Sequence, residues 1–300
     1  MRRIFISVPG DRRLTEAQIA LKWALVRKFE EQGFLPEMFY SEHPHPNSLT
    51  AGRNWSFAEC RNVLRRCVGA IIIGLPRHLF SAEDGAARLP TEYAQIEGAL
   101  AISLEIPTFL LAEEGLSDRG MFFWGGTELI TAFPQEVGAD WLATDKFGHA
   151  LAAFARRIAA RRDIFLAYCS TSEGTARNIK FFIERETGAS VLDWRTDFIE
   201  GRTIIEEIEE AARRTTGGIF LFTRDDALDG ESDVAAPRDN VVFEAGFFAH
   251  AKSRERVLII REKGAKMPAD LGGNIYALLT DRTNIGPLEA RLKRFIETAI

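Results

Sequence analysis

The chain repeats one order of secondary structure twice, and this repeat limits its fold more than any other feature. Short apolar segments of strand length alternate with amphipathic helical stretches in both halves. Gly69 and Gly217 lie 148 residues apart, and Glu97 and Glu244, in later helical stretches, lie 147 apart, as do Arg77 and Arg224. The expected strands are residues 2–9, 68–75 and 106–112 in the first half and 161–168, 217–223 and 256–262 in the second.

Continuous apolar strands separated by helices are typical of a parallel sheet that is covered on both faces. We therefore predict an α/β fold of two tandem flavodoxin-like domains, each a parallel sheet with helices on both faces. The boundary is expected near Arg161 and Arg162, which gives domains 1–161 and 162–300. Unrelated α/β units also resemble one another at this level, so the matched glutamates are the stronger sign of duplication.

Charge and composition exclude several classes of function. The chain has 38 Lys and Arg against 43 Asp and Glu, a net charge of -5, so nucleic acid is not an expected partner. Three cysteines without metal-ligand spacing and five scattered histidines favour a reducing compartment and no metal site. No segment approaches the roughly 18 apolar residues of a membrane span, so we expect a cytoplasmic protein without a membrane partner.

Familiar nucleotide and nucleophile motifs do not occur in the sequence. It contains no GxxxxGK[ST] loop, no GxGxxG after a strand and no GxSxG. A Walker-type nucleotidase, a standard Rossmann dehydrogenase and an α/β-hydrolase are therefore not supported.

One carboxylate stands out in the second half. Glu244 lies in the apolar segment RDNVVFEAGFFAHA (238–251), and a glutamate is seldom buried without a partner. Open parallel sheets bind ligands at the carboxyl ends of their strands, where aromatic, cationic and acidic side chains of this half should meet. We expect a nucleotide-like ligand there, with bases to stack and phosphates to neutralise. The candidate substrate-binding residues are Phe165, Tyr168, Ser170, Trp194, Arg195, Asp225, Asp226, Arg238, Asn240 and Phe243.

A structural role is the alternative for these residues. Glu244 could be a buried carboxylate that is satisfied by Arg238 or by a backbone group, and the aromatic residues could belong to the core.

Three segments of the second half carry a resemblance to a known family. FLFTRDD (220–226), RDNVVFEAGFFAHAKSRERVLII (238–260) and MPADLGGNIYALL (267–279) resemble the TIR-like domain of bacterial effectors in CBASS and Pycsar antiphage systems. The resemblance covers roughly residues 162–284. It implies a TIR-like NAD hydrolase domain in which Glu244 is catalytic and NAD is the substrate, with no separate cofactor. It also implies a homo-oligomer that completes the active site.

The expected reaction is cleavage of the bond between nicotinamide and ribose. Nicotinamide in NAD is a cationic leaving group, so a carboxylate beside the ribose can stabilise the oxocarbenium-like transition state without a separate acid. The apolar neighbours Val241, Val242 and Phe243 would exclude water and raise the pKa of Glu244. Linear, cyclic and base-exchanged products all stay open.

The first half keeps the glutamate but not the motif around it. The sequence before Glu97 reads RLPTEY (88–93), and a longer insertion spans residues 40–57. In outline this half is a divergent TIR-like domain, and it also resembles nucleoside deoxyribosyltransferase-like folds. Its expected nucleotide pocket contains Ser7, Arg53, Trp55, Arg77 and Glu97.

Three roles are open for the first half. It could be a second active site with N-ribosyl or deoxyribosyl transferase activity, a scaffold, or a regulatory domain that binds a cyclic or other nucleotide. We favour the regulatory role, because an effector that destroys NAD needs a gate. For the whole chain, the main alternative is a non-catalytic nucleotide-binding module. The loop 191–201, expected to expose Trp194 and Phe198, is a candidate contact between copies.

Overall fold

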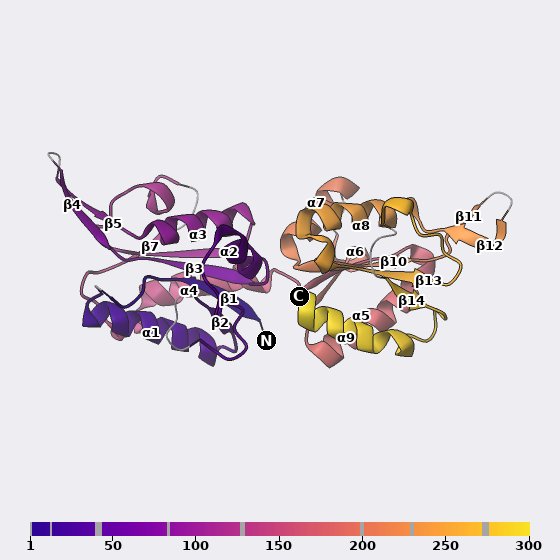
Figure 1. The fold of residues 1–300 in the computed structure, drawn as a ribbon, viewed down its shortest axis with the longest axis horizontal. Helices are drawn as coiled ribbons and strands as arrows, with labels where there is room; N and C mark the ends of the chain where they lie inside the picture. Colours follow the sequence, from indigo (N-terminus) through magenta and orange to yellow (C-terminus); the bar gives the residue numbers. More distant parts are fainter. Residues whose placement is uncertain are drawn as a thin grey trace. The chain divides into compact units, whose positions relative to one another are not determined.

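A computed structural model describes residues 2–12, 14–39, 44–82, 85–126, 130–198, 201–228, 231–271 and 276–300. The chain divides into two compact units, Met1–Ala160 and Arg161–Ile300, one residue before the expected boundary. Each unit has a five-stranded sheet with helices packed on both faces (Figure 1). The predicted fold class is therefore confirmed.

The sheet of the first unit has the strand order β2-β1-β3-β6-β7, and every pairing in it is parallel. The strands are β1 (Arg3–Ser7), β2 (Leu35–Glu37), β3 (Gly69–Gly74), β6 (Thr108–Glu113) and β7 (Ile130–Phe133). The helices are α1 (Glu16–Glu31), α2 (Phe57–Leu64), α3 (Glu92–Ser103) and α4 (Asp145–Ala159), with the 3-10 turns η1 (Gly120–Phe122) and η2 (Ala139–Ala143).

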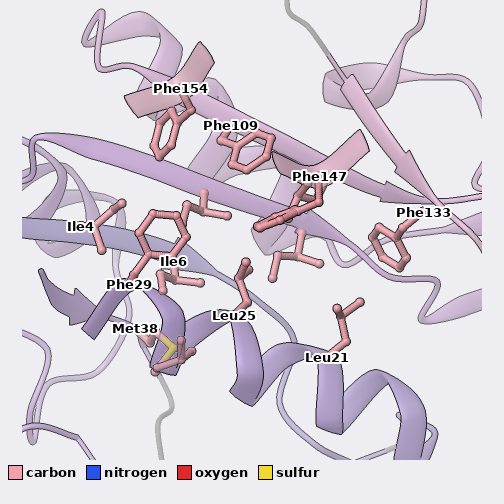
Figure 2. Close-up of a cluster of buried hydrophobic side chains, with 14 of the residues drawn as sticks. Ile4, Ile6, Leu21, Leu25, Phe29, Met38, Phe109, Phe133, Phe147 and Phe154 are labelled. Carbon is pink, nitrogen blue, oxygen red and sulfur yellow. The ribbon is translucent and has the colours of Figure 1, made fainter. Parts of the chain in front are cut away.

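Alternate strand residues fill a separate core on each face of this sheet. Ile4 and Ile6 belong to the core under α1 and α4, whereas Phe5 between them belongs to the core under α2 and α3. Figure 2 shows the first of these cores, in which the rings of Phe29 from α1 and Phe154 from α4 meet edge to face at 6.3 Å. Burial of both faces explains why β3 is apolar along its whole length.

The second unit has the equivalent strand order β9-β8-β10-β13-β14, again with parallel pairings throughout. The strands are β8 (Ile164–Ala167), β9 (Val191–Asp193), β10 (Gly217–Phe222), β13 (Val257–Glu262) and β14 (Ala277–Leu279). The helices are α5 (Glu173–Thr187), α6 (Trp194–Asp197), α7 (Ile204–Arg214), α8 (Asp239–Lys252) and α9 (Gly286–Ala299), with η3 (Ser170–Ser172), η4 (Arg254–Arg256) and η5 (Ala269–Leu271). α5 and α9 cover one face, and α7 and α8 cover the other.

The residues matched between the halves occupy equivalent places. Gly69 and Gly217 open the central strands β3 and β10. A Cβ on Gly69 would lie 2.8 Å from the ring of Phe154, and one on Gly217 would lie 2.6 Å from Ile300. Each glycine therefore allows the C-terminal helix of its own unit, with the residue that follows it, to pack closely on the strand. Glu97 and Glu244 each lie five residues after the first residue of the helix that follows, α3 and α8.

Each unit also contains a β-hairpin that the sequence did not predict. β4 (His78–Ala82) pairs with β5 (Gly85–Leu89) between β3 and α3, and β11 (Asp226–Leu228) pairs with β12 (Glu231–Ala236) between β10 and α8. Residues 40–43 of the predicted insertion, residues 199 and 200 of the predicted contact loop, and residues 272–275 lie outside the described part of the chain. Among the described helices, none is long and apolar enough to cross a bilayer.

Candidate functional site

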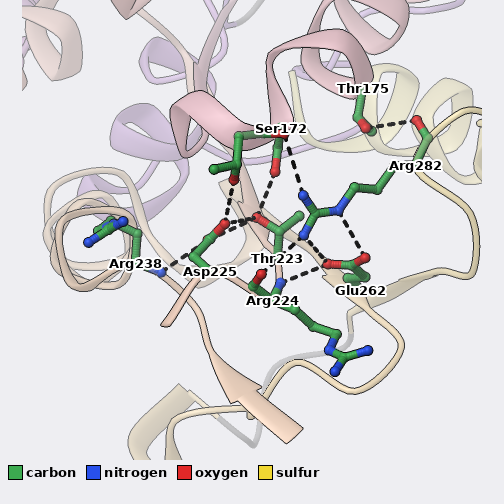
Figure 3. Close-up of polar contacts among 9 residues, drawn as sticks. Ser172, Thr175, Thr223, Arg224, Asp225, Arg238, Glu262 and Arg282 are labelled. Atoms are coloured by element: carbon green, nitrogen blue, oxygen red, sulfur yellow. Dashed lines mark hydrogen bonds and ion pairs between the residues drawn. The ribbon is translucent and has the colours of Figure 1, made fainter. Parts of the chain in front are cut away.

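A polar network joins the carboxyl ends of the strands in the second unit (Figure 3). Asp225, which follows β10, accepts hydrogen bonds from the hydroxyls of Thr171 at 2.8 Å and Thr223 at 2.9 Å. It also accepts the backbone N–H of Arg238, the residue before α8, at 3.2 Å. The carboxylate of Asp225 therefore connects the end of β8, the end of β10 and the start of α8.

Arg282 and Glu262 extend this network to the end of β13. The guanidinium of Arg282 makes a two-point contact with the Glu262 carboxylate, at 2.9 Å from Nε and 2.7 Å from Nη2. Glu262 also accepts the backbone N–H of Arg224 at 2.7 Å. Paired contacts of this kind fix orientation as well as distance, so the loops that surround the candidate site are held by side chains outside it.

Glu244 lies on the apolar stripe of α8. The buried residues of this helix are Val241, Glu244, Ala245 and Phe248, the spacing of one helical face turned to a sheet. Glu244 is 8% exposed and makes no hydrogen bond or ion pair within the described residues. Burial raises its pKa from 4.5 to about 7. Neither Arg238 nor a described backbone group satisfies it, so the structural alternative lacks the partner that it requires.

A cavity of about 820 Å³ opens beside Glu244, large enough for a nucleotide. Seven of the predicted site residues line it: Tyr168, Ser170, Trp194, Arg195, Arg238, Asn240 and Glu244. These residues come from the segment after β8, from α6 and from the start of α8, which are distant in sequence. They gather at the carboxyl edge of the sheet, where the topology is expected to place a ligand.

Tyr168 and Trp194 form the aromatic part of the cavity. Their rings lie 5.7 Å apart, and the hydroxyl of Tyr168 donates to Asp193 at 2.8 Å. Burial and the Asp193 carboxylate raise the pKa of Tyr168, so it stays a neutral donor. The indole Nε1 of Trp194 is buried and has no hydrogen-bond partner among the described residues. Trp194 and Phe198, expected to be exposed, are instead partly buried against the core, which corrects the expected exposed loop.

Every arginine that lines the cavity is already paired with a carboxylate. Arg195 contacts Glu173 at 2.8 Å, and Arg238 contacts Asp226 at 3.1 Å. A hydrogen bond with Cys169, followed by the charge of Asp226, raises the pKa of Arg238. A phosphate that enters the cavity must therefore compete with these carboxylates for the guanidinium groups.

The other predicted residues of this half lie outside the cavity. Phe165 is fully buried in β8, with its ring centroid 5.0 Å from that of Phe248, and so belongs to the core. Asp225 serves the network, and Asp226 faces Arg238. Phe243 is 52% exposed, because it lies on the side of α8 opposite the stripe that holds Glu244.

Residues missing from the predicted site also line the cavity. Five of them have no expected role in the sequence, namely Cys169, Gly201, Arg202, Ile204 and Glu207, whereas Phe198 is expected in the contact loop and Val241 beside Glu244. Thr203 and Glu206 form a capping box at the start of α7, and this sequence signal could have placed Arg202 directly before a helix at the edge of the sheet. Glu207 lies one residue before the buried Ile208 and four before the buried Ala211, so the helical spacing of this stretch could have placed it on the buried face of α7.

The predicted residues of the first unit are only partly brought together. Glu97 is 5% exposed, and the indole of Trp55 donates to it at 2.9 Å. Burial raises the pKa of Glu97 to about 7, against the lowering effect of hydrogen bonds from Ser7 and Trp55. Arg53 is exposed and pairs with Glu59 at 2.7 Å, and the backbone of Arg77 donates to Leu89.

Comparison with known proteins supports the resemblance of the second half. Residues 163–281 match the family described as CAP12/Pycsar effector protein, TIR domain. The uncharacterized protein YuaY of Escherichia coli is 32% identical over 123 residues, which are 40% of this chain and 40% of that protein. CD-NTase-associated protein 12 of a Lachnospiraceae bacterium is 30% identical over 112 residues, which are 37% of this chain and 35% of that protein.

The chain therefore spans well under half the length of these curated relatives. Among solved structures, the TIR domain of the Toll-related Receptor TRR-2 from Hydra magnipapillata is 15% identical, with a TM-score of 0.36 over 46% of this chain and 99% of that domain. The predicted similarity of the second half to the TIR domain of CAP12/Pycsar effectors is confirmed by the family match.

Proposed function

We propose that the second unit is an NAD glycohydrolase and that Glu244 is its catalytic residue. The observation that carries this proposal is the buried carboxylate without a partner at the wall of an 820 Å³ cavity. A carboxylate that is removed from water costs free energy, so its place here favours a function over a structural role. The match of residues 163–281 to a TIR domain family supports the same reading.

The proposed reaction breaks the bond between C1′ of the ribose and the nicotinamide nitrogen. Nicotinamide leaves with the bonding electron pair and becomes neutral, and positive charge develops on the ribose. The Glu244 carboxylate stabilises this charge as it develops at the wall of the cavity. Water then adds to C1′ and releases a proton, which gives ADP-ribose. The aromatic rings of Tyr168 and Trp194 offer stacking surfaces for the substrate.

The substrate, assembly and biological role belong to the same proposal. NAD is the substrate, no cofactor is required, and a homo-oligomer completes the site. The match of residues 163–281 to a TIR domain family of CAP12/Pycsar effectors supports a role in antiphage defence. The first unit would gate this activity by binding a cyclic or other nucleotide near Glu97. Support for the gate is the equivalent position and burial of Glu97 and Glu244 in the repeated fold.

The direct test is NAD consumption by the whole chain, followed as release of nicotinamide. Glu244→Gln should reduce the rate by at least about 100-fold, because the transition-state charge loses its counter-ion. Glu209→Gln is the matched control, since Glu209 is exposed on α7 and lies outside the cavity. A wild-type protein that binds nucleotides but cleaves no NAD, with or without a panel of cyclic nucleotides, would make the chain a binding module.

The role of the first unit needs a separate variant. Glu97→Gln should alter the dependence of NAD cleavage on an added nucleotide and leave the active site of the second unit intact. If Glu97→Gln instead abolishes a nucleoside base-exchange activity, the first unit is a transferase.

A further inference from the structure

The candidate site contains a second buried carboxylate, Glu207 of α7. It is 5% exposed and lines the same cavity as Glu244. Its Oε1 is fully buried and has no hydrogen-bond partner among the described residues. A carboxylate oxygen without a donor is costly inside a protein, and a ligand that supplies the donor removes that cost.

Among the described residues, Glu207 has one ion pair, and the two groups are far apart for such a contact. Arg202 approaches Oε1 with its Nη1 at 3.5 Å, too long or too poorly aligned for a hydrogen bond. The other two cavity arginines hold their carboxylates at 2.8 and 3.1 Å. Arg202 is also half exposed. Of the arginines in the cavity, Arg202 therefore makes the longest contact with its carboxylate, and its guanidinium remains accessible to a phosphate.

The internal repeat is a second, independent reason to place Arg202 in the site. Arg202 comes directly before Thr203, the N-cap of α7, and Trp55 comes directly before Ser56, the N-cap of the equivalent α2. In the first unit, the Trp55 side chain reaches from this position to the buried Glu97 on the next helix. The same position in the second unit therefore directs a side chain to the cavity beside Glu244.

We infer that Glu207 and Arg202 together bind a nucleotide in this cavity, in addition to the contact that Glu244 makes with the substrate. Glu207 accepts hydrogen bonds from ribose hydroxyl or adenine amino groups, and Arg202 leaves Glu207 to bind a phosphate. This inference rests on the proposed function, which supplies the class of substrate. The substrate is a dinucleotide, and its adenosine half extends beyond the ribose at Glu244. Both groups position the substrate, and neither takes part in breaking the bond.

Binding of two probes to the whole chain separates the two contacts. ADP-ribose offers both donors and phosphates, whereas adenosine offers only donors. Glu207→Gln should weaken both probes by roughly 10-fold or more, since a charged acceptor is lost. Arg202→Gln should weaken ADP-ribose by a similar factor and leave adenosine within about twofold. Isothermal titration calorimetry measures all these dissociation constants without any turnover.

Glu209→Gln is again the matched control and should bind both probes as the wild type does, because Glu209 is exposed on the same helix. The thermal midpoint of Glu207→Gln should not fall, so weaker binding cannot be assigned to unfolding. Equal affinity of Glu207→Gln and wild type for both probes overturns the inference, as does a wild type that binds neither. A wild type that binds ADP-ribose in the expected pattern but cleaves no NAD refutes only the proposed function.

Discussion

Replacing Glu244 with glutamine should stabilise the second unit, and the gain should depend on pH in a defined direction. Burial raises the pKa of Glu244 from 4.5 to about 7. The folded state therefore holds the proton more strongly than the unfolded state, and ionisation of Glu244 opposes folding. This cost is absent below about pH 4.5, grows as the pH rises through the interval to 7, and is complete above 7.

The magnitude follows from the two pKa values. Each pKa unit corresponds to about 1.4 kcal/mol, so the move from 4.5 to about 7 amounts to about 3 kcal/mol at pH 8. Glutamine keeps the shape of the side chain and has no charge to desolvate. For a unit of this size, about 3 kcal/mol corresponds to a rise in the thermal midpoint of roughly 10 °C.

Denaturant unfolding of wild type and Glu244→Gln between pH 4.5 and 8.5 measures this difference directly. The stability of the variant relative to wild type should climb with pH and level off above about pH 7.5. Glu209→Gln, which alters an exposed acid, should show no such climb. A difference that is constant with pH, or one that shrinks as the pH rises, would refute the burial of an ionised Glu244 as its cause.

Three further predictions concern both units. NAD cleavage should increase with pH through an apparent pKa near 7, because the proposed active form of Glu244 is the carboxylate; a flat kcat/KM profile from pH 5.5 to 8.5 would contradict this. Trp55→Phe removes the indole donor to Glu97 and should lower the stability of the first unit by about 1–3 kcal/mol above pH 7, and by less below it, as measured by urea unfolding. Gly217→Ala should destabilise the second unit by about 1–3 kcal/mol, because the added Cβ would lie 2.6 Å from the carbonyl oxygen of Arg256. Gly246→Ala in α8 has open space around the added Cβ and should stabilise the unit by up to about 1 kcal/mol. Equal thermal midpoints for the two variants would count against this packing argument.

The fold was predictable because its determinants are periodic. Strands buried on both faces are apolar along their whole length, as in β3 and β10, and this pattern alone indicates a covered parallel sheet. The hairpins β4–β5 and β11–β12 were missed because each follows a central strand in a segment that reads as a connecting loop.

The site was predictable at the helix but not at the residues around it. Glu244 was found because a carboxylate inside an apolar stripe breaks the pattern. Phe165 was misplaced because both faces of β8 are covered, so a side chain within the strand reaches core rather than cavity. Arg202 and Glu207 were missed because ion pairing and burial depend on which helices become neighbours, which composition does not record.

The position of Trp194 makes its fluorescence a natural signal of ligand binding. It is the only tryptophan in residues 161–300, and its indole lines the cavity beside Tyr168. A ligand that stacks on this ring changes both the polarity around the indole and its quenching. In a protein whose other four tryptophans are replaced by phenylalanine, the emission of Trp194 would then report occupancy of the cavity in real time, with no label attached.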